Sequence, residues 1–449
     1  MVTQKTQAGN GIQVPCNAAH AMRCLGLLDK LLAKTKRPAS SFLSLNYSDG
    51  RVLCNRDLSR CQELYGSPWL LVHRADYMAV LLDEAKRLGV EIRVGCKVVA
   101  VDFDRPAVSL PDGQQLQADV VVGCDGIKST IRRLMHPTVV PFATGQHAYR
   151  ILFSRELLLL SPSTSPLASE PGTTRCWLGP HANIVFYPVQ DDRLFNLVIP
   201  IADESFHHSC PEGDVLPCLR AYFRTWDLTI RDLLGAATSV TRFPILQLPP
   251  IPHWSRGCVT LMGDAAHAMV PHLAQGAATS VEDAFILGTL LGRLASLVVV
   301  HLPRHSSSDT PKEEDDEGKR RVRTVLASYE KLQHERTARI AAGSRLTGML
   351  DRLLPGIDQR ARDAEFAAYD AEQATCVSAF PWLDAQTNMA LLGRKVDEVA
   401  RREFRRLLDA GELLPLGMGG GVEDDTSRRS SRRGHGPVVT AGRRQGSRL

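Results

Sequence analysis

The sequence lacks the cysteine spacing of a zinc module or of a disulfide framework. Its eleven cysteines are scattered and odd in number, and they include no C-x-x-C pair. This pattern excludes a disulfide-rich secreted fold and favours a reducing, cytoplasmic compartment. His267 and His272 have no cysteine or carboxylate set beside them in the sequence, so we expect no metal site.

The sequence also lacks a secretory signal and a membrane span. Residues 1–20 contain no apolar core segment. The longest apolar run, residues 284–302, contains Arg293 and two glycines, which favours a buried amphipathic helix. The sequence therefore predicts a soluble protein.

Outside its C-terminal tail the chain also lacks an excess of positive charge, although its net charge is +5. Seven of the 54 basic residues are arginines after Thr426, and the rest of the chain carries 47 basic against 49 acidic residues. A basic tail is compatible with binding to nucleic acid or a membrane surface. Its composition favours a disordered, solvated end, so we expect no nucleic-acid partner.

The first half of the chain alternates helical and strand patterns. Residues 70–89 have apolar residues at helical spacing from Tyr77 onward and end at a glycine. A β-rich run over residues 90–103 follows, and a second apolar strand ends within residues 118–126. This alternation predicts an α/β fold.

Residues 146–201 have a different pattern. Short apolar and aromatic runs are separated by Pro, Gly and Asp turns, which predicts an antiparallel sheet as a separate layer. Helical pattern returns over residues 214–235. The charged, low-complexity residues 303–321 are predicted as a surface loop, and residues 322–349 as a long helix.

Two strand ends carry side chains suited to a polyol or an anion. The stretch ADVVVGCDGIKSTIRR ends an apolar strand at Asp125, and TLMGDAAHAMVPHLAQGAATSVEDA ends another at Asp264. Ligands bind at such strand ends in α/β folds. We expect Asp264 to accept hydrogen bonds from ribose or ribityl hydroxyls. Gly276 and Ala277 allow close backbone approach, and the helix beginning there presents its positive dipole end.

Together these two motifs resemble those of the FAD-dependent aromatic hydroxylases, the flavoprotein monooxygenases of the salicylate-hydroxylase and para-hydroxybenzoate-hydroxylase type. GCDGIKSTIRR is similar to the family's Asp-Gly motif, and GDAAHAMVPHLAQGAATSVEDA is similar to its Gly-Asp motif almost residue for residue. Residues 9–29, which include Gly11, resemble the segment after the family's second strand. VHRADYM resembles the segment whose arginine, here Arg74, contacts the flavin nucleotide.

The sequence departs from the family at its start. The family begins with a βαβ unit that carries G-x-G-x-x-G and an acid for the adenosine ribose, and this sequence contains neither. Either the start of the gene model is wrong, or the encoded FAD-binding domain lacks its first βαβ unit. In the second case we expect FAD to bind much less tightly.

The resemblance implies an α/β architecture: an N-terminally truncated, Rossmann-like FAD-binding domain, an inserted antiparallel-sheet substrate domain, and C-terminal helices. The predicted division is a first FAD-binding segment (1–135), a substrate domain (136–250), a second FAD-binding segment (251–302), a charged loop (303–321), C-terminal helices (322–415) and a disordered basic tail (416–449).

The resemblance also implies a monooxygenase. In such enzymes NAD(P)H reduces FAD, O2 adds to the reduced flavin, and a C4a-hydroperoxyflavin hydroxylates a small aromatic or phenolic substrate. A tailoring step in secondary metabolism fits this chemistry, and the family allows a homodimer. The turn at residues 276–278 would stabilise negative charge on the flavin ring, and Asp125 would serve the flavin pyrophosphate or NAD(P)H.

Arg150 and Tyr187 resemble the arginine and tyrosine that relatives place over the substrate. Asn183 occupies a position where some relatives have a histidine. Two other functions remain open at this stage: a flavin dehydrogenase or reductase of the same fold that inserts no oxygen, and a truncated, non-catalytic remnant.

Overall fold

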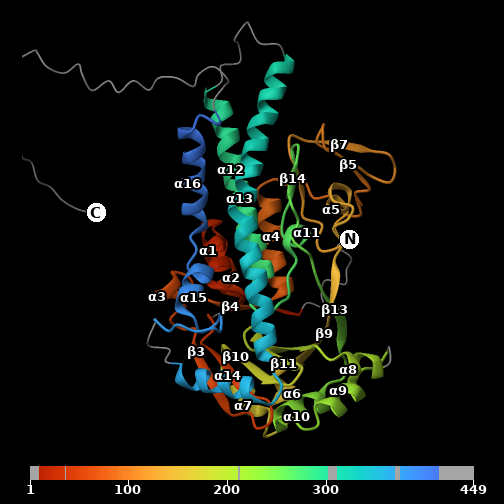
Figure 1. Ribbon diagram of the computed structural model, residues 1–449, viewed down its shortest axis with the longest axis vertical. Helices are drawn as coiled ribbons and strands as arrows, with labels where there is room; N and C mark the ends of the chain where they lie inside the picture. Colours follow the sequence, from red (N-terminus) through yellow and green to blue (C-terminus); the bar gives the residue numbers. More distant parts are fainter. Residues whose placement is uncertain (1–9, 36, 211–212, 302–310, 370–374, 414–449) are drawn as a thin grey trace, which may run out of the picture. The chain divides into compact units, whose positions relative to one another are not determined.

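The computed structural model describes residues 10–35, 37–210, 213–301, 311–369 and 375–413 (Figure 1). These residues belong to the first of two units, Met1–Leu413, and residues 414–449 make up the second. The predicted basic tail therefore lies outside the described residues.

A seven-stranded sheet forms the largest layer, with the strand order β13-β9-β12-β11-β10-β2-β3. The antiparallel sheet predicted over residues 146–201 is confirmed by β9 to β12. Strands β2 and β3 come from a much earlier stretch of the chain, and β2 pairs in parallel with β10, with Ser41 opposite Thr173. The sheet thus extends beyond the predicted 136–250 segment. Its strands are β2 (Ser41–Asn46), β3 (Val52–Asp57), β9 (Phe142–Ser154), β10 (Thr173–Gly179), β11 (Ala182–Val189), β12 (Leu194–Ile201) and β13 (Thr241–Gln247).

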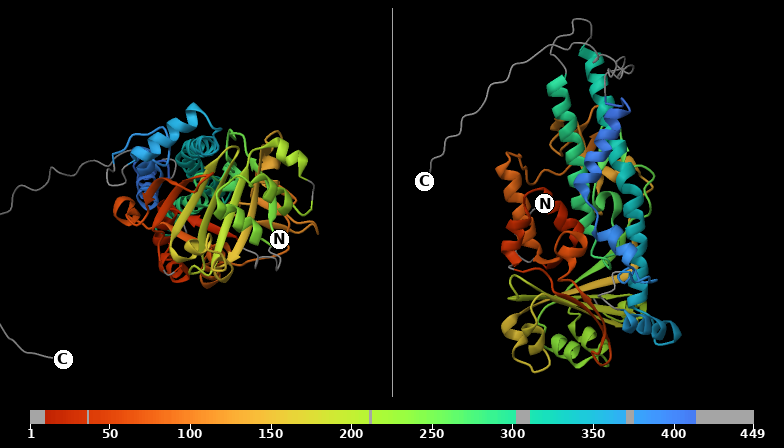
Figure 2. Two further views of the ribbon diagram at one scale, coloured as in Figure 1. Left: turned by 90° about the horizontal axis from the view of Figure 1, so that it is seen from below. Right: turned by 90° about the vertical axis from the view of Figure 1, so that its left-hand side faces the viewer.

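Alternation along the strands divides the side chains between two faces of this sheet. Ile184 and Phe186 belong to a core cluster that β10, β12 and the helices α6 to α10 share. Tyr187 packs in a different cluster. Figure 2 shows α9 and α10 on one side of the sheet and α1 and α2 on the other. The covering helices are α6 (Arg155–Leu158), α7 (Ser165–Ser169), α8 (Glu204–Ser209), α9 (Leu216–Tyr222) and α10 (Leu228–Ala236).

Both predicted carboxylates, Asp125 and Asp264, follow strands of a small three-stranded sheet. Its order is β14-β15-β8, and β15 and β8 are parallel. The strands are β8 (Val121–Gly123), β14 (Ser255–Arg256) and β15 (Val259–Leu261). Helix α5 (Thr130–Met135) follows β8, and α11 (Asp264–His267) and α12 (Gly276–His301) follow β15. The predicted strand–turn–helix pattern is confirmed at both places.

The predicted β-rich run over residues 90–103 is wrong for most of its length. Only β5 (Ala100–Asp102) is a strand, and it pairs with β6 (Ala107–Ser109), which pairs with β7 (Gln115–Gln117). The apolar side chains of Val90, Ile92 and Val94 are exposed. A strand needs a hydrogen-bonded neighbour, and within the described portion of the chain this segment has none.

A two-stranded sheet and three helices make the layer above the large sheet. β1 (Gly11–Val14) pairs antiparallel with β4 (Leu70–His73). Helices α1 (Cys16–Cys24), α2 (Leu28–Thr35) and α4 (Arg74–Arg87) pack around this pair through a shared apolar cluster. The helix predicted within residues 70–89 is confirmed, and Gly89 follows its end with φ of 80°. A short helix, α3 (Cys61–Tyr65), follows β3.

Long C-terminal helices complete the fold. They are α13 (Pro311–Asp351), α14 (Ile357–Ala368), α15 (Ala385–Leu392) and α16 (Val396–Asp409). The charged loop predicted over residues 303–321 is wrong from Pro311 onward, because α13 begins there; residues 302–310 lie outside the described ranges. Oppositely charged residues four apart pair along this helix, as in Lys319–Asp315 and Arg321–Glu317, and such pairs stabilise an exposed helix. None of the helices in the described ranges is long and apolar enough to cross a membrane.

Candidate active site

The predicted carboxylates Asp125 and Asp264 lie at the same edge of the small sheet. Gly123 at the end of β8 is opposite Leu261 at the end of β15, and the Met262 N–H donates to the Gly123 carbonyl over 3.0 Å. Because the two strands are parallel, their carboxyl ends meet. The structure therefore brings these two residues to one edge, as the motifs suggested.

Asp125 is engaged by its own helix. Its Oδ1 accepts a hydrogen bond from Ser129 Oγ at 2.5 Å, and its Oδ2 accepts from the N–H groups of Thr130 at 2.6 Å and Ile131 at 3.2 Å. Ser129 is the N-cap of α5 and accepts from the Arg132 N–H, so Asp125 supplies further acceptors to the N-cap residue and to the first turn of that helix. Its role toward a cofactor stays a prediction.

Asp264 is differently placed. Its side chain is exposed and makes no hydrogen bond or ion pair with any residue that the structure describes. Gly263 before it has φ of 61°, and a Cβ there would lie 2.9 Å from Ser280 Oγ in the first turns of α12. Glycine at this position lets the chain turn sharply and presents the carboxylate outward beside α12.

The beginning of α12 is open. A Cβ added to Gly276 would meet no atom within 4 Å, and Ala277 is exposed. Asn17 on α1 fixes this end, because its Nδ2 donates to Gln275 Oε1 over 2.9 Å. The first N–H groups of a helix have no intrahelical partner, so this end offers donors and a positive dipole end to an anion.

Strand β1 connects this helix end to the large sheet. The Gly11 N–H donates to Asn196 Oδ1 on β12 over 3.1 Å, and Gly11 lies directly against the ring of Tyr187. The Arg74 N–H donates to the Asn10 carbonyl, which places the first residue of α4 beside β1. The Arg74 side chain is exposed and has no partner among the described residues.

The predicted substrate residues share one face of the large sheet. Val198 on β12 is opposite Arg150 on β9 and opposite Val185 on β11. Tyr187 lies two residues after Val185, so Arg150 and Tyr187 point to the same side of the sheet. Burial lowers the pKa of Arg150, the Tyr187 hydroxyl opposes this shift, and the nearby Arg74 adds to it. Burial also raises the pKa of Tyr187 well above its usual range.

Several buried donors on this face have no hydrogen-bond partner in the described structure. They are Arg150 Nε, Asn196 Nδ2, Thr174 Oγ1 and Arg56 Nη1. The Arg150 guanidinium lies 4.9 Å from the centroid of the Phe243 ring, so an apolar group holds it in place. Asn183 is buried and contacts the Cys176 sulfur. Unsatisfied buried donors are costly, and they suit a ligand with acceptor oxygens.

A buried charged network behind the Gly-Asp loop was not predicted. His267 Nε2 lies 2.6 Å from Asp283 Oδ2, which also accepts from the Gly263 N–H over 3.0 Å. The neighbouring Glu282 is completely buried and pairs with Arg336 at 2.7 Å and Arg394 at 2.9 Å. Two adjacent acids inside an otherwise apolar helix were the sequence signal for this network.

The network also gives His267 a specific role. Burial alone would lower the pKa of His267, but the charge and hydrogen bond of Asp283 raise it above the usual value. His267 thus pairs with Asp283 and supports the loop from behind. Burial would raise the pKa of Glu282, but Arg336 and Arg394 lower it.

A cavity of about 660 Å³ lies on the α13 side of the loop. Neither the predicted cofactor residues nor Arg150 and Tyr187 line it. Its walls include Trp254, His267, His272, Pro249 and Met349. We therefore place the candidate active site by the geometry of β1, the start of α12 and the sheet face, and not by this cavity.

Comparisons with known proteins point to FAD-dependent enzymes. Residues 3–211 and 228–296 match the family described as FAD binding domain. The chain is 31% identical over 391 residues to the FAD-dependent monooxygenase OpS4 of Beauveria bassiana (strain ARSEF 2860). The matched residues make up 84% of this chain and 86% of OpS4. It is 30% identical over 294 residues to 3-hydroxybenzoate 6-hydroxylase 1 of Aquipseudomonas alcaligenes, covering 64% of this chain and 72% of that protein.

Solved structures share the fold. A salicylate hydroxylase in complex with its substrate superposes with a TM-score of 0.64 at 24% identity, covering 88% of this chain and 90% of that one. Klebsiella pneumoniae HpxO complexed with FAD and uric acid gives a TM-score of 0.61 at 19% identity, covering 89% and 87%. The predicted α/β hydroxylase architecture is confirmed.

Proposed function

The chain belongs to the family of FAD-binding, FAD-dependent monooxygenases, and we propose that it hydroxylates a small aromatic or phenolic molecule with NAD(P)H as reductant and O2 as oxidant. We place the cofactor on the basis of one observation. The exposed Asp264 carboxylate, which makes no hydrogen bond or ion pair with the described residues, lies beside the open N-terminal end of α12.

The residues present fit FAD. A carboxylate without protein partners suits the ribityl hydroxyls, and the free N–H groups at Gly276 and Ala277 suit the electron-rich edge of the flavin ring. The exposed Arg74 suits the nucleotide phosphates. Gly11 allows the backbone of β1 to lie close to the Tyr187 ring. FAD, when bound, supplies the electron transfer and oxygen insertion. The protein positions it and excludes competing reactions.

Arg150 and Tyr187 act on the substrate in this proposal. Arg150 is a cation held against Phe243 with an unsatisfied Nε donor, so it would bind a substrate oxygen and favour its phenolate form. Tyr187 lies between that face and Gly11, and its hydroxyl would orient the ring. A phenolate is more electron-rich than a phenol and reacts faster with an electrophilic oxygen.

We also propose a setting for the reaction. The relatives include a 3-hydroxybenzoate 6-hydroxylase and a 6-hydroxynicotinate 3-monooxygenase, and a comparable small aromatic acid or phenol in secondary metabolism is our proposed substrate class. All eleven cysteines are free, which supports a reducing, cytoplasmic location. We further propose that the chain forms a homodimer.

Product analysis under isotope-labelled O2 tests the function. The purified chain, supplied with FAD, NADPH or NADH and a panel of phenols and aromatic acids, is expected to yield product carrying one labelled oxygen atom. Substrate oxidation without label would instead identify a flavin dehydrogenase. A protein that stays colourless after incubation with FAD would contradict the proposal at the cofactor step.

A further inference from the structure

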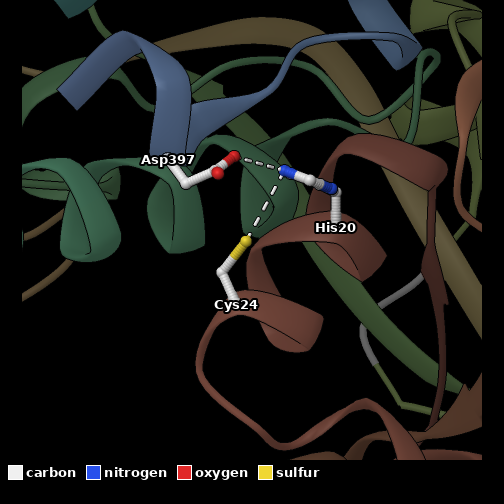
Figure 3. A group of neighbouring side chains, drawn as sticks. All are labelled: His20, Cys24 and Asp397. Carbon is white, nitrogen blue, oxygen red and sulfur yellow. Dashed lines mark hydrogen bonds and ion pairs between the residues drawn. The ribbon is translucent and has the colours of Figure 1, made fainter. Parts of the chain in front are cut away.

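Three side chains of metal-ligating types meet between α1 and α16, and none of them is among the residues of the proposed flavin site. His20 Nε2 lies 2.8 Å from Asp397 Oδ1, and Cys24 Sγ lies 3.5 Å from the same nitrogen. One ligand atom from each of the three residues lies within 4.8 Å of the others. Figure 3 shows the imidazole, thiol and carboxylate pointing toward one another.

The sequence positions explain this meeting. His20 and Cys24 are four residues apart in α1, so they lie on one face of the helix, one turn apart. Asp397 is in the first turn of α16, 377 residues further along the chain than His20. Neither the absence of C-x-x-C pairs nor the surroundings of His267 and His272 in the sequence reveals a site that a distant helix completes.

A single ring nitrogen faces two anionic or potentially anionic groups here. Nε2 of His20 lies within hydrogen-bond reach of both the Asp397 carboxylate and the Cys24 sulfur. A cation bound at this point would contact all three ligand atoms at once.

We propose that His20, Cys24 and Asp397 form a zinc site with three protein ligands and one open coordination position. Imidazole nitrogen, thiolate sulfur and carboxylate oxygen are the donors that zinc takes in proteins, and the thiolate disfavours calcium and magnesium. One thiolate and one carboxylate balance the charge of Zn²⁺. The partly exposed position of the group gives the ion a path of entry.

The neighbouring cations leave this site available. Arg401 pairs with Oδ2 of Asp397, which leaves Oδ1 for the metal. Arg23 donates to the Gly66 carbonyl and to Ser67 Oγ. Lys395 donates to the Tyr65 carbonyl. Arg23 and Lys395 thus have other partners, and Arg401 orients the carboxylate through Oδ2.

The site would join two helices that pack on the same third helix. Both α1 and α16 contact α12, whose first residues contribute to the proposed flavin site. A metal that binds the folded chain and not the unfolded chain stabilises the fold by mass action. We therefore expect zinc to fasten α16 to the flavin-binding layer.

A competition titration tests the site. The full chain, kept reduced and first freed of metal by a chelator, is titrated with Zn²⁺ against a chromophoric chelator, and its unfolding temperature is recorded with and without zinc. We expect one tightly bound Zn²⁺ per chain and a higher unfolding temperature. Alkylation of Cys24, read by peptide mass spectrometry, should become slower when zinc is present.

Cys24→Ser is the diagnostic variant, because Cys24 is exposed and the change should not disturb folding. Its zinc affinity should fall by at least about 100-fold, since the loss of an outer-shell partner alone typically costs about 10- to 100-fold. Cys96→Ser is the matched control, because Cys96 is an exposed thiol outside the cluster. Absence of tight zinc binding by the unsubstituted chain, or equal binding by Cys24→Ser, would overturn the proposal.

Discussion

The ring of Tyr187 fills the space that a side chain at Gly11 would need. A Cβ added to Gly11 would lie 2.5 Å from Tyr187 Cε2 and 2.8 Å from its hydroxyl oxygen. Because the Gly11 N–H also donates to Asn196, strand β1 cannot simply move away. The glycine thus sets how closely β1 approaches the face of the large sheet that carries Arg150 and Tyr187.

Gly11→Ala should therefore displace Tyr187 and lower turnover. Overpacking of this kind typically costs about 1–3 kcal/mol, so the free energy of unfolding should fall as well. Gly288→Ala is the control, because a Cβ at Gly288 in α12 meets no atom within 4 Å. Steady-state kinetics and urea unfolding provide the measurements. Equal kinetics of Gly11→Ala and the unsubstituted chain would show that Tyr187 has room to move.

Asp264 and Asp125 should separate cofactor binding from folding. Asp264→Ala removes a carboxylate that makes no hydrogen bond or ion pair with the described residues, so FAD affinity should fall by roughly 10- to 100-fold, the effect of a lost hydrogen bond to a charged group, while the unfolding temperature changes little. Asp125→Ala removes the acceptor of Ser129 and of the first N–H groups of α5 and should lower the free energy of unfolding by about 1 kcal/mol. Flavin fluorescence titration and thermal unfolding measure both. Normal FAD retention by Asp264→Ala would refute our placement of the flavin.

Arg150→Met should retain FAD but lower kcat by at least about tenfold, because a substrate oxygen loses its cationic partner. Arg150→Lys restores the charge and should recover some of the rate. Arg242→Met is the matched control, since Arg242 lies over the Tyr149 ring on the opposite face of the sheet. Arg150→Met with full turnover would place the substrate elsewhere.

The sequence was most informative where local pattern determines local structure. The strand, the turn after Gly263 and the helix beginning at Gly276 depend on neighbours in the chain, and the structure has all three. The resemblance to aromatic hydroxylases depended on these same residues. It therefore identified the family and the edge of the small sheet where Asp125 and Asp264 lie.

Contacts between distant segments were beyond sequence reasoning. The parallel pairing of β2 with β10 joins residues about 130 positions apart, and no local pattern specifies such a partner. Residues 90–98 have strand-like alternation, but the described chain provides no neighbouring strand. The partners of Glu282 and Asp283 lie in other parts of the chain, so the two acids were visible in the sequence but their ion pairs were not.

The pair formed by His267 and Asp283 should give stability a characteristic pH dependence. Asp283 raises the pKa of His267 above the value of 6.5 expected for the unfolded chain. A raised folded-state pKa means that the native protein binds the proton more tightly. The stabilisation is therefore complete below pH 6.5 and is lost as the pH rises through the folded-state pKa.

His267→Gln should consequently destabilise the protein most below pH 6.5, and the difference in free energy of unfolding should shrink toward alkaline pH. His147→Gln is a control of opposite sign. Burial, together with His207 and Arg242, lowers the pKa of His147 to about 4, so the unsubstituted chain loses stability relative to this variant as the pH falls from 6.5 to about 4. Urea unfolding across this range measures both differences. If the free energy of unfolding of the two variants depends on pH in the same way, His267 is neutral in the folded protein. Asp283 would then support the loop only through its hydrogen bond with the Gly263 N–H.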